Sequence, residues 1–370
     1  MNIFNTPSKY PVGIDISDLS MKLVQLNKTR QAVVLQTLSR VAVPSGYIDG
    51  GAIKNKAGAA ELLRKLLTET IFGKVSSREA VVSLPETKTF IKLLSLNSAG
   101  ENLSDAVKVE IAKNIPYELA DVNYDWQVIN QNRDRQKILI AAVPKKIADD
   151  YAAILEGVGL LPVALEIEAA AIARSILPLA YESDKTTLIL DIGASRSGLI
   201  AYADGAILFT ASLPISGKKY TAIIAQKLNL TLAKAEEAKI ICGLDSQAAQ
   251  GIIAKTLKQM TDELVAKIKA ALQHLAAYYP ANLSVGQIYL CGGGASLLGL
   301  DAMLKQKLNI EVTIGDIFTN IRVTSRQKEK YLREKYSAVN GEAQRRERQQ
   351  DFSLTFAAAA GLALRSIYLN

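Results

Sequence analysis

Two aspartates at the ends of apolar segments are the residues of this chain best placed to do chemistry. Asp15 lies in the segment GIDIS (13–17) and Asp191 in the segment LDIGAS (190–195), so each is followed by a turn of small residues. The backbone N–H groups of such a turn can face an anion while the carboxylate faces a cation. We therefore predict that Asp15 and Asp191 hold Mg²⁺ and that the two turns clamp a metal-bound polyphosphate. The alternative for each aspartate is a local role, in which it accepts hydrogen bonds from its own turn.

Residues beside these aspartates can supply contacts for phosphate. In the first half of the chain, Ser17 offers a hydroxyl and Lys22 offers an ammonium group. A lysine at the start of a strand is by default solvated, so Lys22 keeps that alternative. The second turn is richer in small residues, and its predicted phosphate contacts are Gly193, Ala194, Ser195 and Arg196.

A triple glycine between an apolar segment and a helical one is predicted to face the nucleoside part of the ligand. Without Cβ atoms, such a loop lets a flat ligand or a phosphate approach the backbone. A preceding helix could reach the ribose hydroxyls, although a solvated helix face is the alternative for each of its residues. The residues assigned to this side are Gly292, Gly293, Gly294 and Ala295 of the loop and Glu236, Glu237 and Lys239 of the helix.

Glu166 is the candidate catalytic residue. It interrupts the apolar segment VALEIEAAA (163–171), and an unpaired charge is costly to bury. Glu166 could order an attacking water; the alternative is a surface position at the start of a helix. The chain offers no obvious strong general base beside it.

Composition narrows the class of protein. The chain has 370 residues, of which 49% are hydrophobic and 22% charged, which is typical of a globular protein of two domains. Much of the net charge of +8 comes from residues 321–350, where nine Lys or Arg accompany four Glu, so nucleic-acid binding is not expected. The spacing of Cys242 and Cys291 indicates neither a disulfide framework nor a zinc site. The single histidine, His274, disfavours a His-dependent triad, and we expect no signal peptide or membrane span.

The predicted elements place the two aspartates at equivalent positions of a repeat. Three strands followed by a helix are expected at 12–16, 22–26, 32–39 and 57–70, and again at 187–191, 198–202, 207–212 and 217–229. The repeat predicts an α/β protein of two duplicated lobes around a cleft. The predicted first lobe is 1–85 with 160–184, the small α+β insert is 86–159, and the second lobe is 185–230 with 284–370 and a helical part at 231–283. Residues 320–350 are predicted to form a basic surface excursion, and the apolar stretch 352–364 a buried closing helix.

The order of these motifs resembles the actin-like ATPase superfamily, which has a ribonuclease H-like fold and includes actin, sugar kinases, heat-shock chaperone ATPase domains and FtsA. The turns after Asp15 and Asp191 match its two phosphate loops, and the loop at 292–295 matches its adenosine loop. More narrowly, the segments IPYE (115–118), DWQV (125–128), AAVPK (141–145) and GLLPV (159–163) resemble the PilM family of type IV pilus assembly. Two positions depart from the family pattern: Ser17 stands where glycine is usual, and Arg196 where a small hydroxyl residue is more common.

The resemblance implies an ATP-binding adaptor with ATP and Mg²⁺ as cofactors and with slow or absent ATP hydrolysis, which agrees with the lack of an obvious strong general base. Such a protein captures the cytoplasmic N-terminal peptide of the inner-membrane protein PilN in a groove between the first lobe and the insert. It is expected in the cytoplasm, at the inner face of the membrane, where it links the pilus platform to the motors. Self-association is left open.

Two other functions remain as alternatives. A sugar or small-molecule kinase of the same superfamily would need a substrate-side carboxylate acting as a base, whereas the insert suits protein contact better. A filament-forming division protein related to FtsA would form ATP-dependent polymers and carry an amphipathic membrane helix at its C-terminus.

Overall fold

The computed structural model describes residues 10–97, 103–131, 135–179, 181, 185–213, 215–278, 284–327 and 354–368. Most of the predicted basic excursion, from residue 328 onward, lies outside the described residues. No helix in these ranges combines the length and the apolar character needed to cross a membrane.

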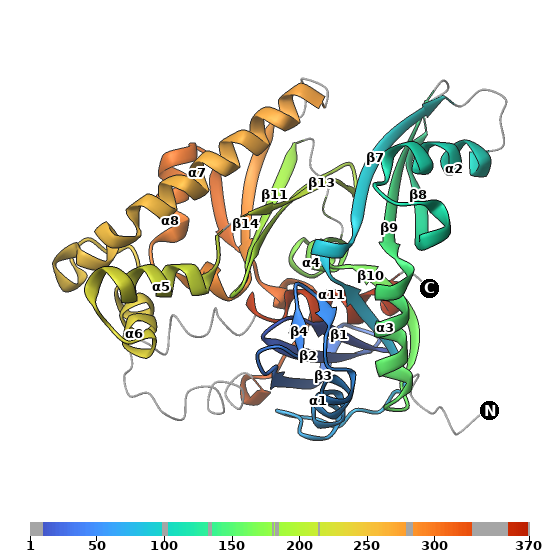
Figure 1. Ribbon diagram of the computed structural model, residues 1–370, viewed down its shortest axis with the longest axis horizontal. Helices are drawn as coiled ribbons and strands as arrows, with labels where there is room; N and C mark the ends of the chain where they lie inside the picture. Colours follow the sequence, from blue (N-terminus) through green and yellow to red (C-terminus); the bar gives the residue numbers. More distant parts are fainter. Residues whose placement is uncertain are drawn as a thin grey trace.

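Two five-stranded sheets repeat one plan, one in each lobe (Figure 1). In each sheet three strands pair antiparallel, a fourth strand joins the first one in parallel, and a fifth strand joins the fourth in parallel. The predicted duplication is thereby confirmed, and β1 and β11 are the equivalent central strands. The first sheet has the order β10-β6-β1-β2-β3, with β1 Val12–Ile16, β2 Ser20–Lys28, β3 Val33–Ala42, β6 Glu79–Leu84 and β10 Leu161–Ile167. The second has the order β13-β12-β11-β14-β15, with β11 Thr186–Ile192, β12 Ser197–Ala203, β13 Ala206–Leu213, β14 Val285–Cys291 and β15 Glu311–Ile314.

The central strands are apolar because helices cover both of their faces. All five residues of β1 are buried, and β11 is buried along nearly its whole length, which is typical of strands between two helical layers. In both strands the aspartate is the residue before the last: Asp15 precedes Ile16, and Asp191 precedes Ile192. Equivalent strand ends therefore carry the two carboxylates.

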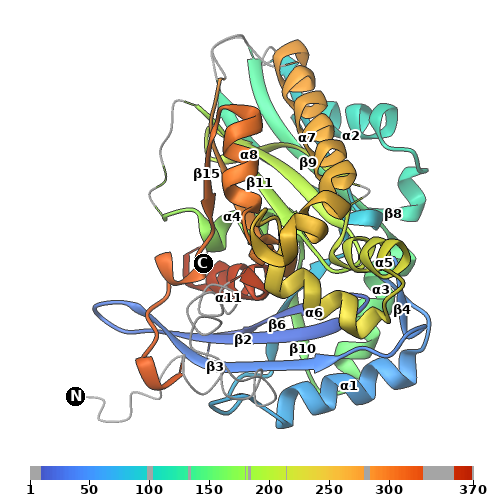
Figure 2. The ribbon, with the colours of Figure 1, turned by 90° about the vertical axis from the view of Figure 1, so that its left-hand side faces the viewer.

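Helices α4 (Glu168–Ile176) and α11 (Ala357–Tyr368) lie between the two sheets (Figures 1 and 2). The predicted buried closing helix is confirmed as α11, since ten of its residues are buried. It packs on β1, β2 and β6 of the first sheet and crosses α4. The crossing is close, because a Cβ on Gly361 would overlap the carbonyl of Ala171. A residue larger than glycine would push α4 and α11 apart.

The insert is a three-stranded sheet with one helix on its outer face. Its strands, in the order β7-β9-β8, are β7 Phe90–Asn97, β9 Arg135–Pro144 and β8 Val122–Gln131, and its helix is α2 Leu103–Asn114. The short η1 (Glu86–Lys88) leads into it, and α3 (Lys145–Glu156) leads out. On the opposite face, Ile91, Leu93 and Leu139 pack against the core of the second lobe. The insert therefore contacts both lobes.

The remaining elements complete the lobes. A small hairpin of β4 (Ile48–Asp49) and β5 (Ala52–Ile53) follows β3; the sequence patterns do not predict it. It precedes α1 (Lys56–Thr68), which Asn55 caps by accepting a hydrogen bond from the Gly58 N–H. The second lobe adds α5 Gly217–Leu228, α6 Leu232–Cys242, η3 Ala248–Gly251, α7 Ile252–Tyr278, η4 Gly293–Ser296, α8 Leu300–Leu308 and η5 Ile317–Thr319.

Candidate functional site

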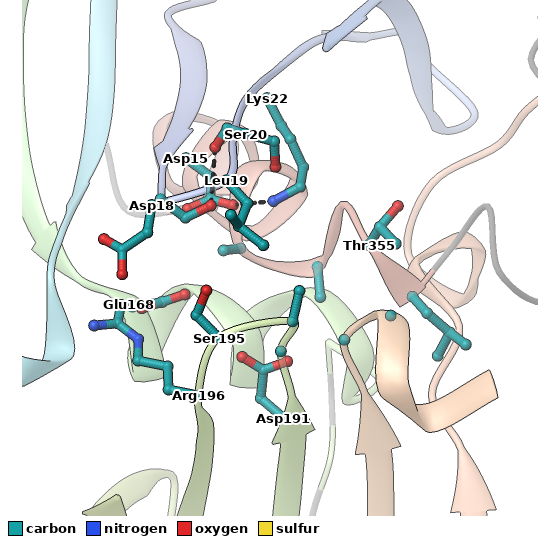
Figure 3. A pocket seen from close by; sticks show the side chains of 18 of the residues that line it. Asp15, Asp18, Leu19, Ser20, Lys22, Glu168, Asp191, Ser195, Arg196 and Thr355 are labelled. Carbon is teal, nitrogen blue, oxygen red and sulfur yellow. Dashed lines mark hydrogen bonds and ion pairs between the residues drawn. The ribbon is translucent and has the colours of Figure 1, made fainter. Parts of the chain in front are cut away.

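The two aspartate turns face one another across a cleft between the lobes (Figure 3). All eight residues predicted to contact phosphate or metal line this cleft. From the first lobe come Asp15, Ser17, Asp18, Leu19, Ser20, Lys22 and Arg40; from the second come Asp191, Gly193, Ala194, Ser195, Arg196, Gly292 and Gly293; and from α4, α11 and the residues before α11 come Glu168, Ile172, Leu354, Thr355, Ala357 and Ala358.

The first turn neutralises its own charge. Asp15 is only 5% exposed, and Lys22 on the neighbouring strand donates to its Oδ2 at 2.6 Å. The two residues are paired directly across β1 and β2, so the register of the hairpin fixes their contact. Ser17 tightens the turn, since its hydroxyl and its backbone N–H both donate to the carbonyl of Ser20. The turn thus presents the ion pair of Asp15 with Lys22 to the cleft, together with the carboxylate of Asp18.

Among the described residues, the Asp191 carboxylate of the second turn has no ion pair comparable to that of Asp15 with Lys22. Burial raises the pKa of Asp191 to about 6, while the charges of Lys22 on the first lobe and of Arg196 in the same turn oppose that rise. The turn is held by its backbone: the carbonyls of Gly193 and Ala194 accept hydrogen bonds from the N–H groups of Gly217 and Lys218, at 3.0 and 2.9 Å. The first turn of α5 is therefore attached directly to this loop.

Arg196 reaches from the second turn to the first lobe. Its Nη2 lies 3.4 Å from Oε2 of Glu168 on α4, and its Nη1 donates to the hydroxyl of Thr87 on η1 at 3.3 Å. Burial alone would lower the pKa of this guanidinium, but Glu168, Glu86 and the other nearby carboxylates raise it above its ordinary value. Arg196 therefore stays positively charged in the cleft, beside the carboxylates of Glu168 and Glu86.

Two glutamates near Arg196, Glu168 and Glu86, were not predicted as site residues from the sequence. Burial, with Asp15 nearby, raises the pKa of Glu168 to about 8. Burial likewise raises the pKa of Glu86 to about 7, against the attraction of Arg196. Glu168 had a signal in the sequence, because it lies in the same apolar segment as Glu166. Glu86 had none, because only the packing of the lobes brings it near the cleft.

Glu166, the predicted catalytic residue, does not line the cleft. Its carboxylate is 7% exposed and is bound by Arg174 of α4 through two contacts and by Arg365 of α11 at 3.1 Å. Arg174 also donates to the carbonyl of Gly361 at 2.8 Å. Glu166 thus joins β10 to the two central helices, and Glu168 is the glutamate of this segment that reaches the cleft.

Only part of the glycine loop reaches the cleft. Gly292 has a φ of +77°, and a Cβ there would overlap Oδ1 of Asp191. Gly292 and Gly293 line the cleft, whereas Gly294 packs on Ile192 and Ala295 is buried. The missing Cβ atoms at Gly292 and Gly293 leave the backbone of the loop open to the cleft beside Asp191.

The helix residues predicted for the nucleoside lie next to the second turn but outside the cleft lining. Lys239 donates to Glu236 at 2.7 Å and to the carbonyl of Gly217 at 3.1 Å, and Glu236 also binds the hydroxyl of Thr221. Because Gly217 is bonded to Gly193, these groups border the cleft on the side of the second lobe. Glu237 points to solvent.

The chemistry of these groups fits a metal-bound polyphosphate. Mg²⁺ is commonly held by one or two carboxylates together with phosphate oxygens and water, and the cleft offers one aspartate from each lobe. Within the described residues, no group of three or more His, Cys, Asp or Glu side chains has a geometry suited to a metal on its own. Asp15 and Asp191 would hold the ion, and Lys22, Arg196 and the backbone of both turns would face the phosphates. A bound Mg²⁺ would offset the negative charge that the ligand brings.

Comparison with solved structures shows the fold. A structure described as a PilM-PilN type IV pilus biogenesis complex matches with a TM-score of 0.77 and 25% identity, over 98% of this chain and 99% of that one. The ethanolamine utilization protein EutJ of Carboxydothermus hydrogenoformans matches with a TM-score of 0.54 and 15% identity, over 98% and 91%. The predicted actin-like ATPase fold of two lobes is confirmed.

Sequence comparison places the chain within that fold. It is 27% identical over 173 residues to the cell division protein FtsA of Borreliella burgdorferi (strain ATCC 35210 / DSM 4680 / CIP 102532 / B31). The match covers 40% of this chain and 41% of that protein, so the chain spans about two fifths of the length of this curated relative. The profile of the family described as type IV pilus assembly protein PilM matches residues 13–367, which is nearly the whole chain. The chain belongs to the PilM family of type IV pilus assembly proteins.

Proposed function

We propose that this protein is a nucleotide-binding adaptor of type IV pilus assembly. It binds Mg-ATP in the cleft between its lobes and binds the N-terminal peptide of a PilN protein between the first lobe and the insert. By this contact it joins the inner-membrane platform of the pilus to cytoplasmic components, at the inner face of the membrane.

The observation that supports nucleotide binding is the position of Asp15 and Asp191, which line the same cleft from opposite lobes. Each aspartate ends the central strand of its lobe, and the charge on Lys22 acts on both of them. Because the site is assembled from two lobes, its affinity for a ligand depends on how the lobes are placed. A bound ligand would therefore favour one degree of closure of the cleft. This arrangement suits a protein whose shape is set by the nucleotide.

The environment of Glu168 supports slow or absent hydrolysis. A general base must be free to take a proton from the attacking water. Glu168 is held by Arg196, and both carboxylate oxygens of Glu166 are engaged by arginines. Neither glutamate is available as a strong base, which favours a structural role for the nucleotide.

The edge of the first sheet supports the peptide part. Strand β10 ends that sheet and has no neighbouring strand on its outer side among the described residues. Leu161 and Val163 on it are 56% and 46% exposed, and α3, which leads out of the insert, packs on the same strand. An extended peptide gains backbone hydrogen bonds at such an edge and apolar contacts from alternate side chains.

Titration of the purified chain with fluorescent ATP and with a labelled N-terminal PilN peptide tests both parts. We expect ATP binding that depends on Mg²⁺, and peptide binding that Leu161→Asp weakens by about 10-fold or more. Leu232→Asp, at a site 64% exposed on α6 of the second lobe, is the matched control and leaves peptide binding unchanged. Absence of peptide binding with and without Mg-ATP would defeat the adaptor role.

A polymer-forming role is the second candidate, because of the sequence match to the division protein FtsA. Sedimentation with and without Mg-ATP separates the two: pelleted polymers that require nucleotide would favour it. The apolar residues of α11 itself are buried against α4 and the first sheet.

A further inference from the structure

The turn between β4 and β5 connects the first phosphate turn to both ends of the insert. Gly50 and Gly51 form this turn with φ values of +53° and +77°, which glycine adopts without strain. The Gly51 N–H donates to Oδ1 of Asp18 in the first phosphate turn at 2.9 Å. The Gly51 carbonyl accepts a hydrogen bond from the buried Tyr151 of α3 at 2.9 Å, and the Gly50 carbonyl accepts one from Thr87 of η1 at 2.7 Å.

Close packing reinforces these bonds at the start of the insert. A Cβ on Gly51 would overlap Pro85, the residue just before η1. The turn therefore lies directly against the chain where it leaves β6. A movement of η1 would shift Gly51 and, through the hydrogen bond of the Gly51 N–H, Asp18.

Arg196 and Gly198 of the second lobe complete the connection. Arg196 donates to the same Thr87 hydroxyl oxygen whose proton points to Gly50, so Thr87 joins the hairpin to the second phosphate turn. Beside it, a Cβ on Gly198 would lie 2.8 Å from Oε2 of Glu86, which shows how closely η1 approaches β12. Both phosphate turns are thus connected through one hydroxyl at the start of the insert.

We propose that the Gly50–Gly51 turn, Thr87 and Arg196 form a latch between the cleft and the insert, which polyphosphate in the cleft opens by drawing Arg196 away from Thr87. A guanidinium binds phosphate through charge-assisted, often bidentate hydrogen bonds that are about twice as strong as neutral ones. Its present contacts, at 3.3 Å to Thr87 and 3.4 Å to Glu168, are long by comparison. The proposal rests on nucleotide binding in the cleft and adds how that binding would reach the insert.

Hydrogen exchange at the latch, followed by mass spectrometry with and without Mg-AMPPNP, tests the proposal without the peptide. In the unmodified chain, nucleotide is expected to speed exchange in residues 48–54 and 85–90 by about fivefold, the effect of losing one hydrogen bond. Thr87→Val keeps the shape of the side chain and removes its hydrogen bonds. It should show the fast exchange already without nucleotide, and nucleotide should then change it by less than about twofold.

Thr29→Val is the matched control, because it makes the same change of side chain and removes only exposed hydrogen bonds within the β2–β3 turn, to Gln31 and Ala32, at the end of β2 opposite to the cleft. It should respond to nucleotide as the unmodified chain does. Calorimetry on the same samples reports nucleotide affinity separately. Binding without a change in exchange, or an equal response in Thr87→Val, would overturn the latch alone, whereas absence of nucleotide binding would defeat the proposed function and the latch together.

Discussion

The two aspartate turns share a position in the fold but differ in how their charge is balanced. In the first turn Lys22 of the same lobe holds Asp15 at 2.6 Å. In the second, Asp191 is buried without such a partner and its pKa is raised to about 6, while Arg196, the cation of that turn, points to Glu168 of the other lobe. The first turn is complete by itself, and the second depends on what lies across the cleft.

This difference indicates which half of the site responds to a ligand. A neutralised aspartate gains little when a metal ion arrives, because its lysine must give way. An uncompensated buried carboxylate gains more, since its burial is costly until a cation joins it. We therefore expect Asp191 to dominate metal binding and Asp15 to contribute less.

The largest expected effect tests that ranking directly. Asp191→Asn should weaken Mg-ATP binding by more than about 100-fold, because partners outside the metal shell already cost about 10- to 100-fold. Asp15→Asn should weaken it less. Calorimetric titration with Mg-AMPPNP measures both, and retention of stoichiometric nucleotide by Asp191→Asn would show that the metal lies elsewhere.

An exposed aspartate provides the control for these variants. Asp262 on α7 pairs with Lys258 at 2.9 Å and lies on the outer surface of the second lobe. Asp262→Asn makes the same chemical change far from the cleft, so nucleotide affinity should stay unchanged. Equal losses of nucleotide affinity in Asp15→Asn and Asp191→Asn would contradict the expected difference between the two turns in metal binding.

Gly292→Ala tests whether the glycine loop beside Asp191 keeps that carboxylate in place. A Cβ at this position would overlap Oδ1 of Asp191, and the φ of +77° is unfavourable for alanine. We expect nucleotide affinity to fall by about 10-fold, through displacement of the carboxylate, together with a lower melting temperature. Gly205→Ala is the control: its φ is also positive, but the space around it is open, so the substitution causes backbone strain without an overlap. If both variants lose affinity equally, strain and not displacement is responsible.

Much of the site could be predicted from the sequence because it repeats. Each aspartate stands at the end of an apolar strand beside small residues, and these local patterns depend on strand geometry alone. The glycine loop was likewise visible as a break between a strand and a helix. In the structure the residues of both turns, with Gly292 and Gly293, line one cleft.

The residues that sequence reasoning missed depend on packing between distant segments. Glu166 and Glu168 stand two positions apart, yet Arg174 and Arg365 engage the first while the second faces the cleft. Arg365 lies 199 positions away from Glu166 in the chain, and no local sequence pattern predicts a contact between them. The same holds for Thr87 and Arg196, which only the approach of the two lobes brings together.

A smaller effect concerns the pH dependence of stability, which the buried acids near the cleft should control. Burial raises the pKa of Asp191 to about 6, that of Glu86 to about 7 and that of Glu168 to about 8. The folded chain therefore keeps protons that the unfolded chain releases near pH 4, so the free energy of unfolding falls as pH rises from about 4 to about 8. The melting temperature, measured by calorimetry without nucleotide, should drop by several degrees over that range. Glu168→Gln should flatten the profile, and a melting temperature that rises with pH would contradict these pKa shifts.

The smallest expected effect lies in the first turn, at the serine that departs from the family pattern. Ser17 is not among the described residues with positive φ, so its backbone does not require glycine. Its hydroxyl donates to the Ser20 carbonyl at 2.9 Å, a bond that Ser17→Gly would remove while freeing the unfolded chain. Fluorescent-ATP titration should show a change of less than about threefold, with a slightly lower melting temperature. A tenfold gain in affinity would instead mean that the first turn is too rigid for phosphate, and that it, more than the second turn, limits binding.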